Sequence, residues 1–473
     1  MISLYLILSF ILSIVLSAPT FPTPPSEDDF YIPPQGFENA KSGDILKYRN
    51  TPNKLRSIYF PLNVANSWQL LVRSEDSFGN PNAFVTTIME PYNADPNKVV
   101  SYQTYEDSAH IDCSPSYGFL YGASMSTLGS QTDMTLMVLA LNRGYYVVSP
   151  DYEGPKSAFT AGRQSGYATL NSIRATLNSK NITGINTNAK LAMWGYSGGS
   201  LASGWATALL PTYAPELERS VIGTALGGFF SNVTALLDHS DAGLVSGLIP
   251  NTLNGLSNEY PNITQILRDN SDPNQADLLK AAKDQCVVLS ALRNLGENYF
   301  TGKDPYFPNG YDVLKVPEVN AVLQENNLVE LDATKYLPST PIFIYHGTLD
   351  QVLPIRDSLQ TYKQWCDAGV NSVEFAEDLL NGHLTEYIIG APAAWTWLEK
   401  RFDGVPPVQG CSHTTRLENL LYPNISQATS DYFDGLVDAV SFAKIGYQGL
   451  ASDNVSTSSF GSLLSGLGTL LAG

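Results

Sequence analysis

A serine in a sharp turn is the first candidate for chemistry in this sequence. Residues 195–199, Gly-Tyr-Ser-Gly-Gly, have the Gly-x-Ser-x-Gly spacing that exposes a serine Oγ between a strand and a helix. Residues 191–194 before the motif are strand-like, and residues 201–210 after it are helix-like. N–H groups at the start of such a helix point toward the negative charge that forms when serine attacks a carbonyl carbon. The motif predicts Ser197 as the nucleophile of acyl transfer; the alternative is a glycine-rich turn without catalysis.

A nucleophilic serine needs a base, and histidine is the usual one. The chain has five histidines: His110, His239, His346, His383 and His413. Where this serine turn occurs, the chain order is nucleophile, acid, histidine, so only the last two come late enough. His413 lies two residues from Cys411 in a polar stretch, whereas His383 follows a strand-like run and a loop and precedes a helical run. We therefore predict His383 as the base.

The acid that orients the base should come one strand–helix unit earlier. Residues 341–345, Pro-Ile-Phe-Ile-Tyr, have the composition of a buried strand, and His-Gly-Thr-Leu-Asp follows directly. This places Asp350 in a loop at the end of the strand, where a carboxylate can fix one imidazole tautomer. Asp357 in the following helix is the weaker candidate. We expect His346 to serve the turn rather than catalysis.

The elements that would hold these residues alternate between strands and helices. Strand-like runs occupy residues 69–73, 84–89, 99–102, 145–149, 191–194, 221–224 and 342–345, and helical runs occupy residues 133–142, 166–177 and 201–210. This alternation predicts an α/β fold with a mostly parallel sheet and helices on both faces. Between residues 231 and 320 no strand pattern occurs, which predicts a helical insertion.

Composition limits the class of protein. Apolar residues make up 43% of the 473 residues, enough for a sizeable core, and the formal net charge of −18 makes nucleic acid an improbable partner. Residues 1–17 carry no charged side chain and predict a signal peptide, with an uncleaved anchor as the alternative. Asn-x-Ser/Thr sequons, which fit a secreted glycoprotein, occur at Asn181, Asn232, Asn262, Asn424 and Asn454.

The four cysteines, Cys113, Cys286, Cys366 and Cys411, favour two disulfides in an oxidising compartment, and three connectivities are open. Their spacing indicates no metal site.

Five boundaries follow from these patterns. After the signal peptide, an extended, proline-rich arm is expected over residues 18–45, with a propeptide as the alternative. The core is expected over residues 46–230 and 321–403, with the helical insertion at 231–320 between them. Residues 404–473 form a C-terminal segment. Its last part, residues 445–473, has one charged side chain, Asp453, and many leucines, glycines and serines.

Three motifs, the Ser197 pentapeptide, His-Gly-x-x-Asp350 and Gly-His383, resemble those of the α/β-hydrolases. Residues 105–108, Tyr-Glu-Asp-Ser, together with the proline-rich entry, the cysteine placement and the length, make the chain resemble the fungal secretory lipase family. That family includes secreted lipases of Candida-type yeasts and the lipase A type of basidiomycete yeasts. The resemblance covers nearly the whole mature chain and implies an α/β-hydrolase fold with an inserted helical cap and a C-terminal flap.

The resemblance also implies roles for single residues. Ser197, Asp350 and His383 would be nucleophile, acid and base, the same three that the motifs predict. Asp107 and the backbone N–H of Gly198 would form the oxyanion hole, with a surface loop acid as the alternative role for Asp107. The implied disulfides are Cys113–Cys286 and Cys366–Cys411.

The implied activity is hydrolysis of lipid esters, above all triacylglycerols, by a secreted monomer that uses no cofactor or metal. The expected partner is a lipid ester at an oil–water interface, without stable membrane insertion. A serine peptidase of the prolyl type is one alternative, although no propeller repeat is visible. A general carboxylesterase and a non-enzymatic lipid-binding surface protein are the others. Residues 445–473 or 231–320 are expected to supply a movable cover; for residues 445–473, simple packing on the core or a lipid-anchor signal are the alternatives.

Overall fold

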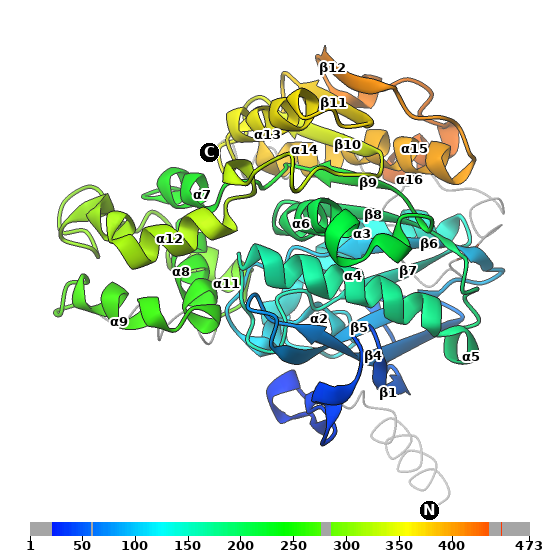
Figure 1. Ribbon diagram of the computed structural model, residues 1–473, viewed down its shortest axis with the longest axis horizontal. Coiled ribbons are helices and arrows are strands. Elements are labelled where there is room, and N and C mark those ends of the chain that lie inside the picture. The colour runs from blue at the N-terminus through cyan, green and yellow to red at the C-terminus, as the bar shows by residue number, and fades with distance from the viewer. Residues whose placement is uncertain (1–20, 58–59, 276–284, 435–445, 447–473) are drawn as a thin grey trace, which may run out of the picture.

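A mixed ten-stranded sheet forms the centre of the molecule (Figure 1). The structure is a computed structural model that describes residues 21–57, 60–275, 285–434 and 446. The strand order is β1-β4-β5-β7-β6-β8-β9-β10-β11-β12. The bounds are β1 (Ile45–Asn50), β4 (Asn66–Glu75), β5 (Pro81–Glu90), β6 (Asp95–Gln103), β7 (Tyr145–Pro150), β8 (Lys190–Tyr196), β9 (Val221–Gly227), β10 (Ile342–Gly347), β11 (Ser372–Asp378) and β12 (Gly410–Arg416). A separate short pair joins β2 (Arg56–Ser57) to β3 (Phe60–Pro61).

The strands from β7 to β12 in this order are parallel, while β5, β4 and β1 pair antiparallel at one side. Every strand run that the sequence predicts is present, so the prediction of a mostly parallel sheet is confirmed. Parallel strands bring their carboxyl ends to one edge of the sheet, and loops at that edge are the usual place for a site.

Helices cover both faces of the sheet. Side chains alternate along β8: Leu191 and Met193 belong to one buried core, and Ala192 and Trp194 to the other. The first core includes α4 (Gly162–Asn178), α6 (Gly198–Tyr213) and Trp365 of α13 (Ile355–Asp367). The second includes α3 (Leu128–Asn142) and α15 (Ala391–Phe402). The remaining short helices near these faces are α2 (Pro115–Gly118), α5 (Lys180–Thr183), α14 (His383–Ile389) and α16 (Gln427–Asp434).

Between β9 and β10 the described residues form helices and no strand, and these helices lie together at the left of Figure 1. They are α7 (Val233–Ser240), α8 (Leu248–Glu259), α9 (Asn262–Asp269), α11 (Val287–Arg293) and α12 (Pro317–Asn326). Helix α12 extends past residue 320, the predicted end of the insertion. It begins at Pro317, and its buried side chains keep helical spacing as far as Asn326. We call this region, residues 231–331, the cap.

Two terminal segments differ from expectation. The arm is not extended throughout, since it folds into the 3-10 turns η1 (Pro25–Glu27), η2 (Asp29–Tyr31) and η3 (Phe37–Asn39). The C-terminal segment contributes a strand, β12, parallel to β11. The sequence did not predict β12, because this edge strand is half exposed to water and carries Ser, His and Thr in place of an apolar run.

Some predictions lie outside the described residues. These are the signal peptide, the Asn454 sequon, and the leucines and cover function expected of residues 447–473. Within the part of the chain that the structure describes, no helix is both long enough and apolar enough to cross a membrane.

Candidate active site

The turn between β8 and α6 holds Ser197 at a positive φ. Ser197 has φ 52° and ψ −123°, a conformation that most side chains avoid because Cβ crowds the backbone. A Cβ added at Gly195 would lie 2.2 Å from the carbonyl oxygen of Gly199, and one at Gly199 would lie 1.9 Å from that of Gln103. The two glycines of the motif are therefore required by close backbone contacts, and the predicted strand–turn–helix is present.

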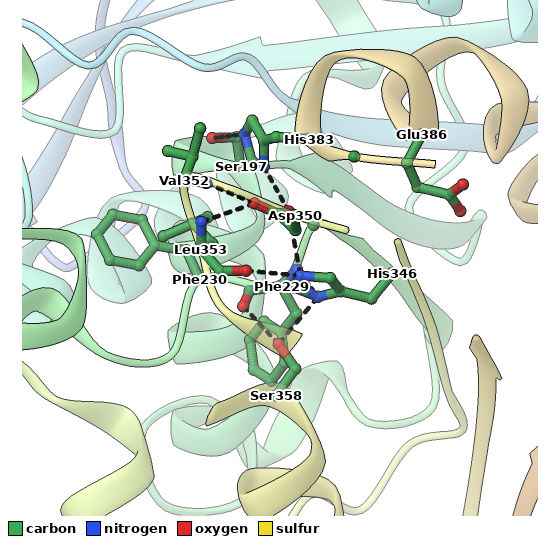
Figure 2. Close-up of polar contacts among 12 residues, drawn as sticks. Ser197, Phe229, Phe230, His346, Asp350, Val352, Leu353, Ser358, His383 and Glu386 are labelled. Carbon is green, nitrogen blue, oxygen red and sulfur yellow. Dashed lines mark hydrogen bonds and ion pairs between the residues drawn. The ribbon is translucent and has the colours of Figure 1, made fainter. Parts of the chain in front are cut away.

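His383, the first residue of α14, lies between the serine and the acid (Figure 2). Its Nε2 is 2.9 Å from Ser197 Oγ, and its Nδ1 is 2.7 Å from Asp350 Oδ2. Because Nδ1 faces a carboxylate, it carries the proton, which leaves Nε2 to accept the Ser197 hydroxyl. Tyr196 fixes the other side of the histidine by donating its hydroxyl to the His383 carbonyl oxygen at 2.6 Å.

Asp350 follows β10 and is held by hydrogen bonds from several directions. Oδ1 accepts the backbone N–H groups of Val352 and Leu353 at 2.9 and 2.7 Å. Burial alone would raise the pKa of Asp350, but the adjacent imidazoles of His383 and His346 and their hydrogen bonds hold it well below its usual range. The carboxyl group is therefore an anion that can stabilise a charged His383.

His346 does more than serve the turn. The ring is fully buried, its Nδ1 accepts the N–H of Phe229 at 3.0 Å, and its Nε2 lies 3.1 Å from Asp350 Oδ2 (Figure 2). Because Nδ1 accepts, Nε2 carries the proton and donates toward the acid and toward the carbonyl oxygen of Leu353, 2.9 Å away. His346 and His383 thus contact the same oxygen of Asp350, Oδ2. The His-Gly-x-x-Asp spacing was the only sequence signal for this contact.

The two competing candidates lie elsewhere. Asp357, on α13, accepts a hydrogen bond from the side-chain amide of Asn232 at 3.1 Å. Among the described interactions it contacts neither His383 nor His346. His413, on the edge strand β12, pairs with Glu377 at 2.7 Å. The structure therefore brings together Ser197, Asp350 and His383 and leaves both alternatives outside.

Asp107 lies beside Ser197, over the first residue of α6. A Cβ added at Gly198 would lie 1.8 Å from Asp107 Oδ1, and that oxygen has no hydrogen-bond partner in the described residues. The backbone at Asp107 has φ 48°, and its carbonyl oxygen accepts the amide of Asn251 in α8 at 2.7 Å. Burial raises the pKa of Asp107 to about 7. Asp107 and Gly198 therefore adjoin, as the resemblance implies, and Asp107 is a buried residue, not a surface loop acid.

Three more buried acids follow the ends of β6 and β7. Burial and the neighbouring Asp151 and Asp107 raise the pKa of Glu106, and burial with Glu106 and Asp107 raises that of Glu153. Burial raises the pKa of Asp151 to about 7. The sequence places these acids after the ends of two neighbouring strands, but their burial depends on tertiary packing and cannot be seen in composition. We call Glu106, Asp107, Asp151 and Glu153 the carboxyl group cluster.

Both disulfides have the pairing that the resemblance implies. Cys113, just after the Asp107 loop, is joined to Cys286 at the start of α11 in the cap, and Cys366 of α13 is joined to Cys411 of β12. Of the sequons, Asn181, Asn262 and Asn424 are exposed. Asn232 is engaged within the fold, since its Oδ1 accepts the N–H of Ala235 at the start of α7. Glycosylation stays a prediction.

Comparison with protein families matches residues 120–410 to the family described as secretory lipase. The chain belongs to the secretory lipase family. Lipase 1 of Candida albicans is 57% identical over 448 residues, which cover 95% of each chain. Lipase 2 of the same organism is 55% identical over 437 residues, covering 92% of this chain and 93% of that protein. These relatives support lipase activity for this member of the family.

Solved structures agree with the family. Candida antarctica lipase A in its closed state has a TM-score of 0.78 and 28% identity, covering 88% of this chain and 96% of its own. The rice cell wall degrading esterase LipA of Xanthomonas oryzae has a TM-score of 0.58 at 14% identity, covers 78% of this chain and supports the fold alone. With the mixed sheet and its flanking helices, these neighbours identify the fold as that of the α/β-hydrolases.

Proposed function

We propose that this chain is a secreted triacylglycerol lipase that cleaves fatty-acid esters through Ser197, His383 and Asp350. The observation that carries the proposal is the position of His383, within hydrogen-bonding distance of Ser197 Oγ at 2.9 Å and of Asp350 at 2.7 Å, in a member of the secretory lipase family. No described group of three or more His, Cys, Asp or Glu side chains has the arrangement of a metal site.

In the first half of the reaction, Ser197 Oγ attacks the ester carbonyl carbon while its proton moves to His383 Nε2. Asp350 stabilises the imidazolium that forms. The carbon–oxygen bond to the alcohol then breaks, and His383 returns the proton to the leaving alkoxide, which departs as an alcohol such as a diacylglycerol. The acyl group remains esterified to Ser197.

In the second half, water attacks the acyl carbon and gives its proton to His383. The bond to Ser197 Oγ breaks, Oγ takes the proton back, and the fatty acid is released. In both halves the carbonyl oxygen becomes negative, and we assign its stabilisation to the N–H of Gly198 and to Asp107.

The test of the function is hydrolysis by the purified chain of triacylglycerols of graded acyl length, followed by titration of released fatty acid. Ser197→Ala should lower kcat by about a millionfold, because it removes the nucleophile. An active enzyme that cleaves only dissolved short esters would be a general carboxylesterase, and one that cleaves amides faster than esters would be a peptidase. A wild-type protein that binds lipid without hydrolysing any of these substrates would be a binding protein.

Asp107 can be tested with a matched pair of variants. At mildly acidic pH, where the Asp107 carboxyl group is protonated, Asp107→Ala removes an O–H donor near the oxyanion and should lower kcat about 100-fold. Asp107→Asn supplies an amide N–H donor of similar shape in its place and should lose much less. Equal losses in the two variants would contradict a hydrogen-bonding role for this side chain. Sequencing of the mature N-terminus of the exported protein tests the predicted signal peptide.

A further inference from the structure

Helix α3 carries a buried aspartate, Asp133, that no step of the mechanism uses. The residue is fully buried, and the positions around it on α3 belong to the second apolar core. A carboxyl group taken out of water costs free energy unless hydrogen bonds in the fold replace those it loses. Burial raises the pKa of Asp133 to about 7, and hydrogen bonds from three neighbours act against that rise. These three neighbours make a carboxyl group tolerable at this place.

The three hydrogen bonds to Asp133 come from three different parts of the chain. Oδ1 accepts the hydroxyl of Tyr102, at the end of β6, at 3.0 Å and the hydroxyl of Tyr387, on α14, at 2.8 Å. Oδ2 accepts the backbone N–H of Tyr105 at 2.9 Å. The hydroxyl of Tyr105 is hydrogen-bonded to Thr132, the residue before Asp133 on α3. One carboxyl group therefore joins a strand, a loop and a helix to α3.

The bond from Tyr105 fixes the start of the Asp107 loop, residues 104–109, where the backbone leaves β6. Two residues later, Asp107 has a φ of 48°, a conformation that a side chain other than glycine adopts only when its surroundings hold it. Asp107 also lies directly over Gly198, so a small shift of this loop moves the group beside the nucleophile. Asp133 is thus one of the contacts that hold the loop in place.

The bond from Tyr387 fixes the helix of the base. His383 and Tyr387 are four residues apart on α14, so they lie on the same side of this seven-residue helix, which is too short to be stable without outside contacts. The ring of Tyr387 packs edge-on against the ring of Tyr196, with the centroids 5.2 Å apart. Tyr196 in turn donates its hydroxyl to the His383 carbonyl oxygen. The hydroxyl of Tyr387 therefore connects the support of His383 to Asp133.

We propose that Asp133 is a positioning residue that holds the Asp107 loop and the helix of the base at a fixed separation around Ser197. It acts through Tyr105 on the loop and through Tyr387 on the helix, and it touches no substrate. This inference rests on the proposed function. A displacement of about 1 Å in such a site can lower the rate about 100-fold, so contacts behind the reacting groups affect catalysis.

Tyr387→Phe and Tyr102→Phe are a matched pair of variants, because each removes one hydroxyl that donates to the same oxygen of Asp133. Only Tyr387 lies on the helix of the base, so Tyr387→Phe should lower kcat for dissolved p-nitrophenyl butyrate about tenfold. Its KM should stay within about twofold, because no contact with the ester is removed. Tyr102→Phe should leave both constants within about twofold of the parent. Equal kcat values in the two variants would overturn the proposal.

Two substitutions of Asp133 itself grade the effect. Asp133→Ala removes both acceptor oxygens and should lower kcat about 100-fold, whereas Asp133→Asn keeps one and should lower it only about tenfold. Tyr387→Phe added to Asp133→Ala should cause no further loss, because the partner of the hydroxyl is already absent. Additive losses would show that Tyr387 acts independently of Asp133 and would contradict the proposal. Thermal unfolding identifies a variant that does not fold, and the tyrosine pair then decides.

Crystal structures of the two tyrosine variants measure the positioning without any reaction. The distance from His383 Nε2 to Ser197 Oγ, 2.9 Å in the parent, should exceed about 3.2 Å in Tyr387→Phe and stay below it in Tyr102→Phe. An unchanged distance in Tyr387→Phe would refute the positioning role. A wild type that hydrolyses no ester would instead refute the proposed function, and these distances would still decide whether Asp133 positions the base.

Discussion

Asp350 and Asp107 both lie buried beside the Ser197 turn, yet their surroundings are opposite. Asp350 accepts two backbone N–H groups and faces two imidazoles, and these contacts hold its pKa well below the usual range. Asp107 has an oxygen without a partner among the described residues, and burial raises its pKa to about 7. An aspartate side chain is therefore an anion at position 350 and, at mildly acidic pH, a neutral acid at position 107.

The largest expected effect comes from removing the anion on the Asp350 side. Asp350→Asn should lower kcat about 10⁴-fold, because an amide next to Nδ1 favours the wrong tautomer of His383 and cannot stabilise its charged form. Thermal unfolding should show that the variant still folds. Wild-type kinetics in a folded Asp350→Asn protein would refute its role as the orienting acid.

The second effect is the pH dependence of the free energy of unfolding, which has opposite signs for the carboxyl group cluster and for Asp350. The raised pKa values of Asp107 and Asp151 in the carboxyl group cluster give stability that is full below about pH 4, the unfolded value, and is lost as pH rises through about 7. Asp350 acts in reverse: its contribution is present above about pH 4 and is lost as pH falls toward its lowered pKa. The free energy of unfolding should therefore fall by several kcal/mol between about pH 5 and pH 8.

Urea unfolding across this pH range measures the effect, with Asp107→Asn as the control. The amide cannot ionise, so this variant should lose less stability at alkaline pH than the parent. A stability that rises with pH in the parent would show that the cluster is ionised and stabilised by contacts in the fold.

The third effect concerns the disulfides, one on each side of the site. Cys113–Cys286 fastens the segment after Asp107 to the cap, and Cys366–Cys411 fastens α13 to β12. Replacing either pair by serine should cost about 2–5 kcal/mol of unfolding free energy. Only loss of Cys113–Cys286 should also lower kcat, because that disulfide holds the segment after Asp107, which we assign to stabilising the negative carbonyl oxygen. Equal kinetic effects of the two replacements would break this distinction.

The smallest effect should come from His346. His346→Leu removes one donor to Asp350, worth roughly 1 kcal/mol, and should lower kcat about tenfold. It should also shift the acid limb of the pH–rate profile upward, because the carboxylate loses a contact that favours ionisation. His346→Gln, which can keep a donor at that position, should restore most of the rate. A change in stability without a shift of the limb would leave His346 a purely structural residue.

The sequence predicted the parts of this molecule that have strong local patterns. The buried strands around Ser197 and Asp350 are continuous apolar runs. Chain order left His383 and His413 as candidates, and the strand, loop and helix pattern around His383 separated the two. Strand β12 was missed because its polar alternation resembles a loop. The support of Asp350 by His346 and the burial of Glu106 beside Asp151 depend on tertiary packing, which brings together residues that no local pattern relates.

The order of the disulfides has a consequence for synthesis. Each disulfide joins two consecutive cysteines of the chain: Cys113 is joined to Cys286, and Cys366 is joined to Cys411. During export each second cysteine therefore meets a single unpaired thiol, its correct partner, and no reshuffling of mispaired bonds is required. The 173-residue separation of the first pair takes roughly 10–35 s to translate. During that interval the Ser197 turn is synthesised while Cys113 is still a free thiol. Strand β8 and helix α6 can therefore pack before the disulfide joins Cys113 to the cap.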